Sequence, residues 1–212
     1  MRILARSIRT RPTGVQPLAP ADAPALWAAY QQDQDGRNWT YLPYGPFTDV
    51  ASFERWVAES SASSDPQFYS VSLAPARGEQ AGSAVGVIEV GHIAYSPALQ
   101  RTPAATEVMY LLMRRVFDEL GYRRYEWKCD ALNAPSRRAA QRLGFSYEGV
   151  FRQAVVTKGR NRDTAWYACI DKEWPALEEA YQRWLSPANF DDQGHQVDSL
   201  SSLTAPVLVA LG

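Results

Sequence analysis

The sequence has few cysteines and histidines, which limits the metal and redox chemistry that it can support. Cys129 and Cys169 are its two cysteines, and each lies in a run that alternates apolar with polar residues, without CxxC spacing. The two histidines are far apart in the chain, so the spacing of a zinc site is lacking. We therefore expect two buried free thiols, no bound metal and a reducing, cytoplasmic location.

Long apolar runs and a net charge are also lacking. Arginines interrupt the stretch from Met1 to Arg11 before a signal-peptide core could form, and no window is apolar enough to span a membrane. With 22 basic and 23 acidic residues, the formal charge is -1, so no overall field favours nucleic acid or an anionic membrane. Any anion-binding site must therefore be local.

The composition is that of a folded protein, with 46% hydrophobic residues, 12% aromatic residues and 7 Trp among 212 residues. This length suits one domain, or one domain with an appendage. We expect a folded domain over residues 1–185 and a C-terminal tail over residues 186–212. The tail is polar until Val207–Leu211, and we expect it to dock on the domain or on a second subunit.

Periodicity predicts the order strand, helix, strand, helix, hairpin in the second half of the chain. Apolar residues at helical spacing predict helices over residues 23–30, around 53–57, and over 103–120, 133–143 and 175–185. Asp22 and Asn133 are placed as N-caps, and Gly121 and Gly144 as helix stops. Strand-like runs cover residues 68–73, 84–95, 124–130, 147–157 and 164–170, with an exposed turn over 74–82 and a hairpin loop over 158–162.

A helix start suited to anions follows one strand-like run. Thr102 can cap the free amides there, and Pro103 has no first-turn amide to lose. Unpaired amides and the positive end of the helix dipole then face outward, which is how proteins hold phosphate with little formal charge. Small Ala104 and Ala105 would let a diphosphate approach, and Arg101 would add a contact. Taken alone, the turn is equally consistent with an anion-binding site and with an ordinary capped helix start.

Four stretches resemble, in order and spacing, motifs of the GNAT acetyltransferase superfamily over roughly residues 10–185. They are Glu89–His92, Gln100–Glu107, Asn133–Ser136, and Leu143–Phe145 with Glu148–Arg152. The ribosomal-protein and protein N-terminal acetyltransferase branch is the most similar. The resemblance implies an α/β fold with a mixed, mostly antiparallel twisted sheet and helices on both faces. It also implies acetyl-CoA as co-substrate and direct attack of a primary amine on the thioester.

The resemblance assigns cofactor contacts to three parts of the chain. The diphosphate is expected on the turn that follows the family pattern Q/R-x-x-G-x-G/A, and the pantetheine arm along the edge where residues 92–95 diverge from the Trp127 strand. The segment that begins at Asn133 is expected beside the cofactor. The expected cofactor-binding residues are His92, Ile93, Ala94, Gln100, Arg101, Thr102, Pro103, Ala104, Ala105, Thr106, Asn133, Ser136 and Arg137.

Ser136 and Glu89 are the candidates for catalysis. By the resemblance, the Ser136 hydroxyl protonates or hydrogen-bonds the leaving thiolate, because Ala140 replaces the tyrosine of many family members. The attacking amine must be neutral, and Glu89 or His92 is placed to act as a base through water. A structural role is the alternative for both: an ion pair for Glu89 and a satisfied strand histidine for His92.

An aromatic segment lies where the family's acceptor-binding segment usually falls. Trp39, Tyr41, Tyr44 and Phe47 stand there among two prolines and a glycine, which predicts an ordered loop. These residues form either the wall of a pocket for a peptide N-terminus or small amine, or a cover over the core.

Two departures from the family pattern carry consequences. Pro103 stands where glycine is usual, so the turn loses one amide donor and relies more on Arg101 and the helix dipole. Relatives have a full strand and turn where Val87 and Ile88 stand here, so a central hairpin is shortened. The exposed edge would be covered by residues 207–211, by a second subunit of a homodimer, or by a different pairing of the run at 68–73.

The sequence thus predicts an acetyl-CoA-dependent N-acetyltransferase whose acceptor is a protein N-terminus or a small amine. Two other interpretations stay open: a CoA-binding regulator without turnover, and a protein-interaction module on the same scaffold. Neither nucleic acid nor a membrane is expected as a partner.

Overall fold

The computed structural model describes residues 14–72 and 86–212, and the chain divides into two compact units. The aromatic unit comprises residues 14–72 and 94–108 of the described chain, and the sheet unit comprises residues 86–93 and 109–212. Helix α4 (Pro103–Arg114) begins in the former and ends in the latter. The turn predicted over residues 74–82 lies outside the described residues.

Two helices and a small sheet enclose the core of the aromatic unit. Helices α2 (Ala23–Tyr30) and α3 (Val50–Ser61) agree with the two short helices predicted there. Strand β1 (Gly14–Pro17) pairs antiparallel with β2 (Tyr69–Ser72). The fully packed core residues are Leu18, Ala23, Trp39, Leu42, Phe53 and Val57.

Asp22 does not cap α2, contrary to the prediction. It ends a short 3-10 turn in helical conformation, with φ -77° and ψ -17°, so its side chain makes no cap hydrogen bond to α2. The Asp22 carboxylate instead accepts hydrogen bonds from the amide of Ala19 (3.0 Å) and from Oγ of Ser70 (2.8 Å). Asp22 therefore ties the start of the unit to β2.

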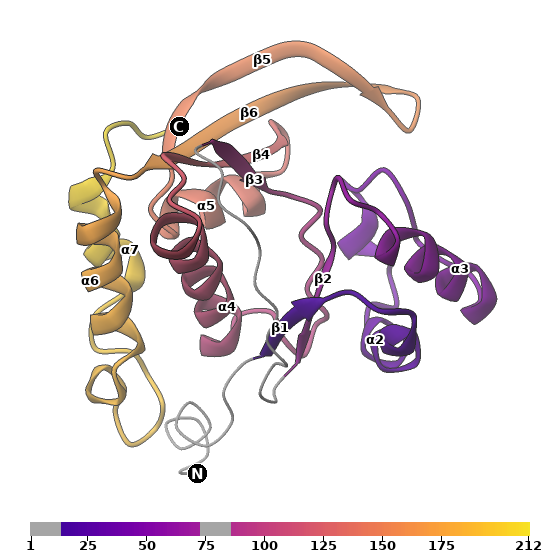
Figure 1. Cartoon of the computed structure of the whole chain (residues 1–212), viewed down its shortest axis with the longest axis horizontal. Coiled ribbons are helices and arrows are strands. Elements are labelled where there is room, and N and C mark those ends of the chain that lie inside the picture. The colour runs from indigo at the N-terminus through magenta and orange to yellow at the C-terminus, as the bar shows by residue number, and fades with distance from the viewer. Residues whose placement is uncertain (1–13, 73–85) are drawn as a thin grey trace. The chain divides into compact units, whose positions relative to one another are not determined.

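A four-stranded sheet in the order β3-β4-β6-β5 forms the centre of the sheet unit (Figure 1). Its strands are β3 (Val87–Val90), β4 (Arg124–Asp130), β5 (Ser146–Thr157) and β6 (Arg160–Ile170). The pair β3–β4 is parallel, and the other two pairs are antiparallel. This arrangement confirms the predicted mixed, mostly antiparallel α/β sheet.

The β5–β6 hairpin turns more tightly than predicted. Lys158 and Gly159 form its two-residue turn, with φ of 49° and 74°, the backbone geometry that matches the twist of adjoining strands. Arg160 already pairs with Thr157. The hairpin loop predicted over residues 158–162 was therefore too long.

Helices flank this sheet within the same unit. Helix α4 continues into a π-helical turn at Arg115–Glu119, and α5 (Ala134–Arg142) and α6 (Trp174–Leu185) follow as predicted. Phe117, in the π-helical turn, stacks on Trp174 of α6, with ring centroids 5.4 Å apart, and meets Tyr125 of β4 edge-on at 6.4 Å. These rings join the end of α4 to both the sheet and α6.

The C-terminal residues lie along α5 and the start of β5. After helix α7 (Leu200–Thr204), the amide of Val209 donates to Oγ of Ser146 (3.0 Å), and the amide of Tyr147 donates to the carbonyl of Ala210 (3.1 Å). The final apolar segment thus contacts β5 rather than the β3 edge for which it was considered. A second subunit over the β3 edge stays a prediction.

Within residues 14–72 and 86–212, each helix is too short or too polar to cross a bilayer. In the same described segments, His, Cys, Asp and Glu side chains form no group of three that could hold a metal ion. Cys129 and Cys169 are buried and free, which confirms that prediction.

Candidate functional site

The turn before α4 is organised by Thr102. Its Oγ1 donates to the carbonyl of Leu99 (2.7 Å) and accepts from the amide of Ala105 (3.2 Å), so Thr102 caps the helix as predicted. Arg101 is exposed and has a left-handed φ of 60°, and α4 begins at Pro103. The turn therefore combines a capped helix start with an adjacent cation, which favours anion binding.

Two residues expected to touch the cofactor have structural contacts in the aromatic unit. Nε2 of Gln100 donates to the carbonyl of Tyr95 at 2.8 Å. The carbonyl of Ala94 accepts a hydrogen bond of 2.6 Å from Oη of Tyr30. Burial raises the pKa of Tyr30 to about 12, so this hydroxyl remains a proton donor at neutral pH. The cofactor contacts of Ala94 and Gln100 stay predictions.

Strands β3 and β4 part where β3 ends. Their parallel register runs from Val87 opposite Arg124 to Val90 opposite Trp127, whereas β4 continues to Asp130. His92 has a left-handed φ of 53°, a conformation that cannot continue a strand. The strand predicted over residues 84–95 therefore ends at 90, and residues 92 and 93 follow it outside the sheet.

Ser136 is fixed at the junction of β4 and α5. Oδ1 of Asn133 accepts from the amide of Ser136 at 3.1 Å, which confirms Asn133 as the helix cap. Oγ of Ser136 accepts a hydrogen bond of 3.0 Å from Nε1 of Trp127. Asn133 thus holds the backbone of Ser136, and Trp127 holds its hydroxyl.

Trp127 and Cys129 belong to the surroundings of Ser136, and the sequence reasoning gave them no role there. Burial raises the pKa of the Cys129 thiol, and a hydrogen bond from Ser136 opposes this effect. The alternation of β4 predicted that Trp127 and Cys129 share one face, but it did not show that α5, which carries Ser136, covers that face.

Arg137 has two contacts within the sheet unit, and its contact with the cofactor stays a prediction. Its Nε donates to Oη of Tyr167 at 3.2 Å, and its Nη1 donates to the carbonyl of Ala131 at 3.2 Å. Tyr167 is completely buried in the sheet. These two contacts give Arg137 a structural function at the start of α5.

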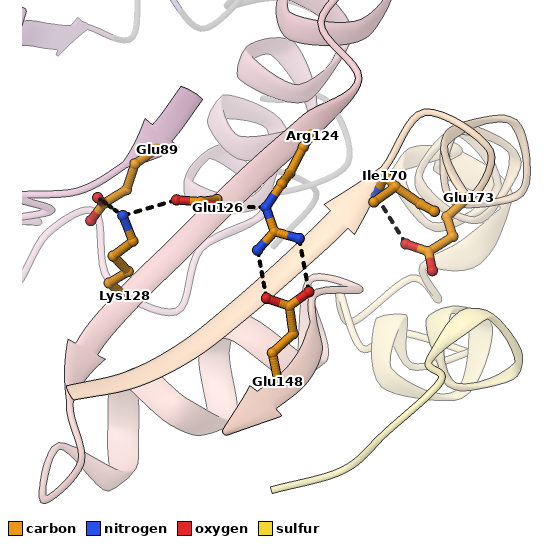
Figure 2. Close-up of polar contacts among 7 residues, drawn as sticks. All are labelled: Glu89, Arg124, Glu126, Lys128, Glu148, Ile170 and Glu173. Atoms are coloured by element: carbon orange, nitrogen blue, oxygen red, sulfur yellow. Dashed lines mark hydrogen bonds and ion pairs between the residues drawn. The ribbon is translucent and has the colours of Figure 1, made fainter. Parts of the chain in front are cut away.

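Glu89 belongs to a line of paired charges on one face of the sheet (Figure 2). Its carboxylate pairs with Nζ of Lys128 at 3.0 Å, and Lys128 also pairs with Glu126 at 2.8 Å. Arg124 continues the line through Nε to Glu126 (2.7 Å) and through its terminal nitrogens to Glu148. The ion pair considered for Glu89 is therefore present, although its side chain is still 37% exposed.

His92 lies just past β3 and is exposed. Partial burial of its imidazole lowers the pKa, nearby Glu89 acts in the opposite direction, and Arg162 lowers the pKa further. The net shift keeps His92 neutral at pH 7.

The aromatic segment mainly builds the core of its own unit. Trp39 is only 4% exposed, and the rings of Tyr44 and Phe47 lie 6.2 and 5.3 Å from it. Tyr41, Tyr44 and Phe47 are each half-buried, so parts of their surfaces remain accessible. The acceptor-binding role of the four aromatic residues stays a prediction.

Known acetyltransferases resemble this chain in sequence and in structure. The family described as Acetyltransferase (GNAT) domain matches residues 14–146. A GCN5-related N-acetyltransferase from Brucella melitensis is 45% identical, with 91% of each chain covered and a TM-score of 0.83. The uncharacterized N-acetyltransferase YnaD of Bacillus subtilis (strain 168) is 23% identical over 158 residues, 69% of this chain and 88% of YnaD. RimL, a ribosomal-protein alpha-N-acetyltransferase solved with coenzyme A, is 19% identical over 76% of this chain and 96% of its own, with a TM-score of 0.58.

Proposed function

The chain belongs to the GNAT acetyltransferase family and is an N-acetyltransferase, and we propose that it transfers the acetyl group of acetyl-CoA directly to the α-amine of a protein N-terminus. The observation that carries the proposal is the Ser136 hydroxyl, held by Trp127 at the start of α5. RimL, which shares the fold, acts on a protein α-amine and has been solved with coenzyme A. That similarity supports both the co-substrate and the class of acceptor.

The residues present suit acetyl-CoA, which supplies an acetyl group activated as a thioester. The capped start of α4 and the cation of Arg101 suit a diphosphate. Strand β4 extends to Asp130 beyond its last pairing with β3, and we assign the pantetheine amides to this edge. Asn133 and Ser136 would bind the thiol end.

We assign to Ser136 the role of assisting the departure of the sulfur. Because its Oγ accepts the Trp127 indole proton, its own O–H, which faces Cys129 here, can turn to donate a hydrogen bond to the developing thiolate. As the amine nitrogen bonds to the acetyl carbon, the bond from that carbon to sulfur breaks. The surplus proton of the amine passes to water or a nearby base.

The available bases favour an acceptor that loses its proton easily. Glu89 is engaged with Lys128, and the pKa of His92 is lowered by burial, so neither is a strong base at neutral pH. An α-amine has a pKa of about 7.7–8.0, whereas lysine has one of about 10.4, so far more of the α-amine is neutral. This difference favours a protein N-terminus over a lysine side chain.

The aromatic unit supplies the surface that we assign to the acceptor. Tyr41, Tyr44 and Phe47 are half-buried and offer ring surface to a peptide, while Trp39 supports them from the core. Removal of these rings should therefore raise the KM of the acceptor.

Thiol release tests the proposal. The enzyme is mixed with acetyl-CoA and one of three acceptors: peptides with a free N-terminus, the same peptides with a blocked N-terminus and a free lysine, and small amines. We expect release with the first group to be at least about tenfold faster than with the second, in line with the pKa difference. Acetyl-CoA binding without release for any amine would instead support a CoA-binding regulator.

A further inference from the structure

Asn38 joins the segment that leads into Trp39 to the turn assigned to the acetyl-CoA diphosphate, all within the aromatic unit. Oδ1 of Asn38 accepts from Nε2 of Gln100 at 2.8 Å, and its Nδ2 donates to the carbonyl of Tyr95 at 3.2 Å. Nε2 of Gln100 donates to the same carbonyl at 2.8 Å. Two side-chain amides and one carbonyl thus form a closed triangle between residues 62 positions apart.

Asn38 is itself anchored to the core of the unit. Its backbone amide donates to Oδ2 of Asp33 at 3.0 Å, and the amide of Arg37 donates to Oδ1 of the same carboxylate at 3.2 Å. Trp39, the next residue, is buried and meets the ring of Phe47 edge-on at 5.3 Å. Since both neighbours are fixed, little conformational entropy remains for Asn38 to lose when it holds the turn.

The turn needs such support because Arg101 adopts a left-handed φ of 60°, which is unfavourable for a residue with a side chain. Gln100, just before it, makes the contact with Asn38, and Thr102, just after it, makes the helix cap. The strained residue is therefore held from both sides.

We infer that Asn38 is a positioning residue that keeps the turn at residues 100–106 in its anion-binding shape and couples it to the aromatic segment at residues 39–47. The inference rests on the proposed role of this turn in binding acetyl-CoA. The Asn38–Gln100 contact is exposed, so it contributes little to folding but enough to change ligand affinity several-fold. Acetyl-CoA bound at the turn then also makes local opening of residues 39–47 less frequent.

Two variants remove the contact from opposite ends: Asn38→Ala and Gln100→Ala. Gln67→Ala is the matched control, since Gln67 is an exposed amide of the same unit that accepts a hydrogen bond from Tyr69. By calorimetry, we expect acetyl-CoA to bind roughly five- to tenfold more weakly to either single variant than to the wild type. The double variant should bind no more than about twofold more weakly than a single variant, and the control should keep the wild-type affinity.

Hydrogen exchange measures the coupling without turnover. Acetyl-CoA should slow amide exchange at residues 39–47 in the wild type and in Gln67→Ala, and should leave it unchanged in Asn38→Ala. Slowing of equal size in Asn38→Ala would show that the coupling does not pass through Asn38.

The affinities can overturn the inference in distinguishable ways. Wild-type affinity in Asn38→Ala and Gln100→Ala removes the positioning role while leaving the proposed function intact. A double variant that loses the product of both single effects shows that the two residues act independently. Failure of the wild type to bind acetyl-CoA overturns the proposed function first and this inference with it. Should Asn38→Ala not fold, Asn38→Leu decides, because it keeps the side-chain volume and removes both hydrogen bonds of the Asn38 amide.

Discussion

The indole of Trp127 and the hydroxyl of Ser136 are joined by a hydrogen bond of 3.0 Å across the junction of β4 and α5. Trp127 is 5% exposed and packs against Phe145, with ring centroids 5.7 Å apart. A buried tryptophan has one rigid donor, so it fixes the direction from which Ser136 accepts. The orientation of the catalytic candidate is therefore set by the sheet core.

Ser136→Ala should lower kcat by about 10- to 100-fold, because the departing thiolate loses its hydrogen-bond donor. The affinity for acetyl-CoA, measured by calorimetry, should change by less than about twofold. Ser61→Ala is the control, since the Ser61 hydroxyl donates an exposed hydrogen bond to the carbonyl of Ala58 in its own helix. Unchanged kcat in Ser136→Ala would remove this hydroxyl from the mechanism.

Trp127→Phe should lower kcat by about three- to tenfold, the equivalent of one lost hydrogen bond of about 1 kcal/mol. The phenyl ring keeps contact with Phe145, so the apolar packing is largely preserved. Because Trp127 acts through Ser136, the change should have no further effect on kcat in a Ser136→Ala background. Additive losses in steady-state kinetics would contradict this dependence.

Pro103→Ala should tighten acetyl-CoA binding by about three- to tenfold, since it restores an amide donor at the first turn of α4. The change should cost at most about 1 kcal/mol of stability, because proline restricts the unfolded chain. Pro175→Ala, at the start of α6, is the control and should leave the affinity unchanged. Calorimetry that shows equal or weaker binding for Pro103→Ala would mean that the diphosphate does not use this amide.

Stability should fall in acid through Glu126. Burial acts to raise the pKa of its carboxyl, but Lys128 and Arg124 outweigh burial, so the pKa lies below its ordinary value. A depressed folded-state pKa contributes stability that is complete above the unfolded pKa of about 4.3 and is lost as the pH falls through the folded value. Urea unfolding from about pH 6 to pH 3 should show a weaker pH dependence for Glu126→Gln than for the exposed control Glu54→Gln. Identical curves would show that Glu126 does not contribute.

Gly144→Ala should cost about 2–4 kcal/mol of unfolding free energy, more than Gly121→Ala at about 1 kcal/mol. Both glycines have positive φ, 92° and 64°, so both variants suffer backbone strain. A Cβ on Gly144 would also lie 2.3 Å from Cδ2 of Leu177, whereas one on Gly121 meets no atom within 4 Å. Equal losses in urea denaturation would show that Leu177 moves aside without cost.

Local signals were sufficient to predict the elements around Ser136. The cap at Asn133 and the glycine at 144 predicted where α5 begins and ends by the ordinary rules of helix ends, and both are observed. Alternation along residues 124–130 predicted β4 and its two faces. Elements of this kind depend on neighbours in sequence, which is why they could be predicted.

Contacts between distant residues could not be predicted in the same way. Nothing in the sequence marks Asn38 as the partner of Gln100, because amide side chains serve many partners. Alternation predicted that Glu126 and Asp130 lie on the charged face of β4, but it did not predict that they are buried, with 8% and 2% of their surfaces exposed. Their burial depends on Lys128, Arg124 and Arg160, which pair with them. The end of β3 also could not be predicted, because it depends on the left-handed backbone of His92, and a histidine in the sequence does not indicate that conformation.

The parallel pairing of β3 with β4 sets an order for folding. The β5–β6 hairpin closes through Lys158 and Gly159 alone, and such hairpins form in roughly 1–10 μs. Strand β3 meets β4 only after the chain has passed through residues 94–108 of the aromatic unit and along α4, and long loops of this kind close slowly. In refolding of the whole chain, we therefore expect the hairpin to form before β3 pairs with β4 and the edge proposed for the pantetheine arm is in place.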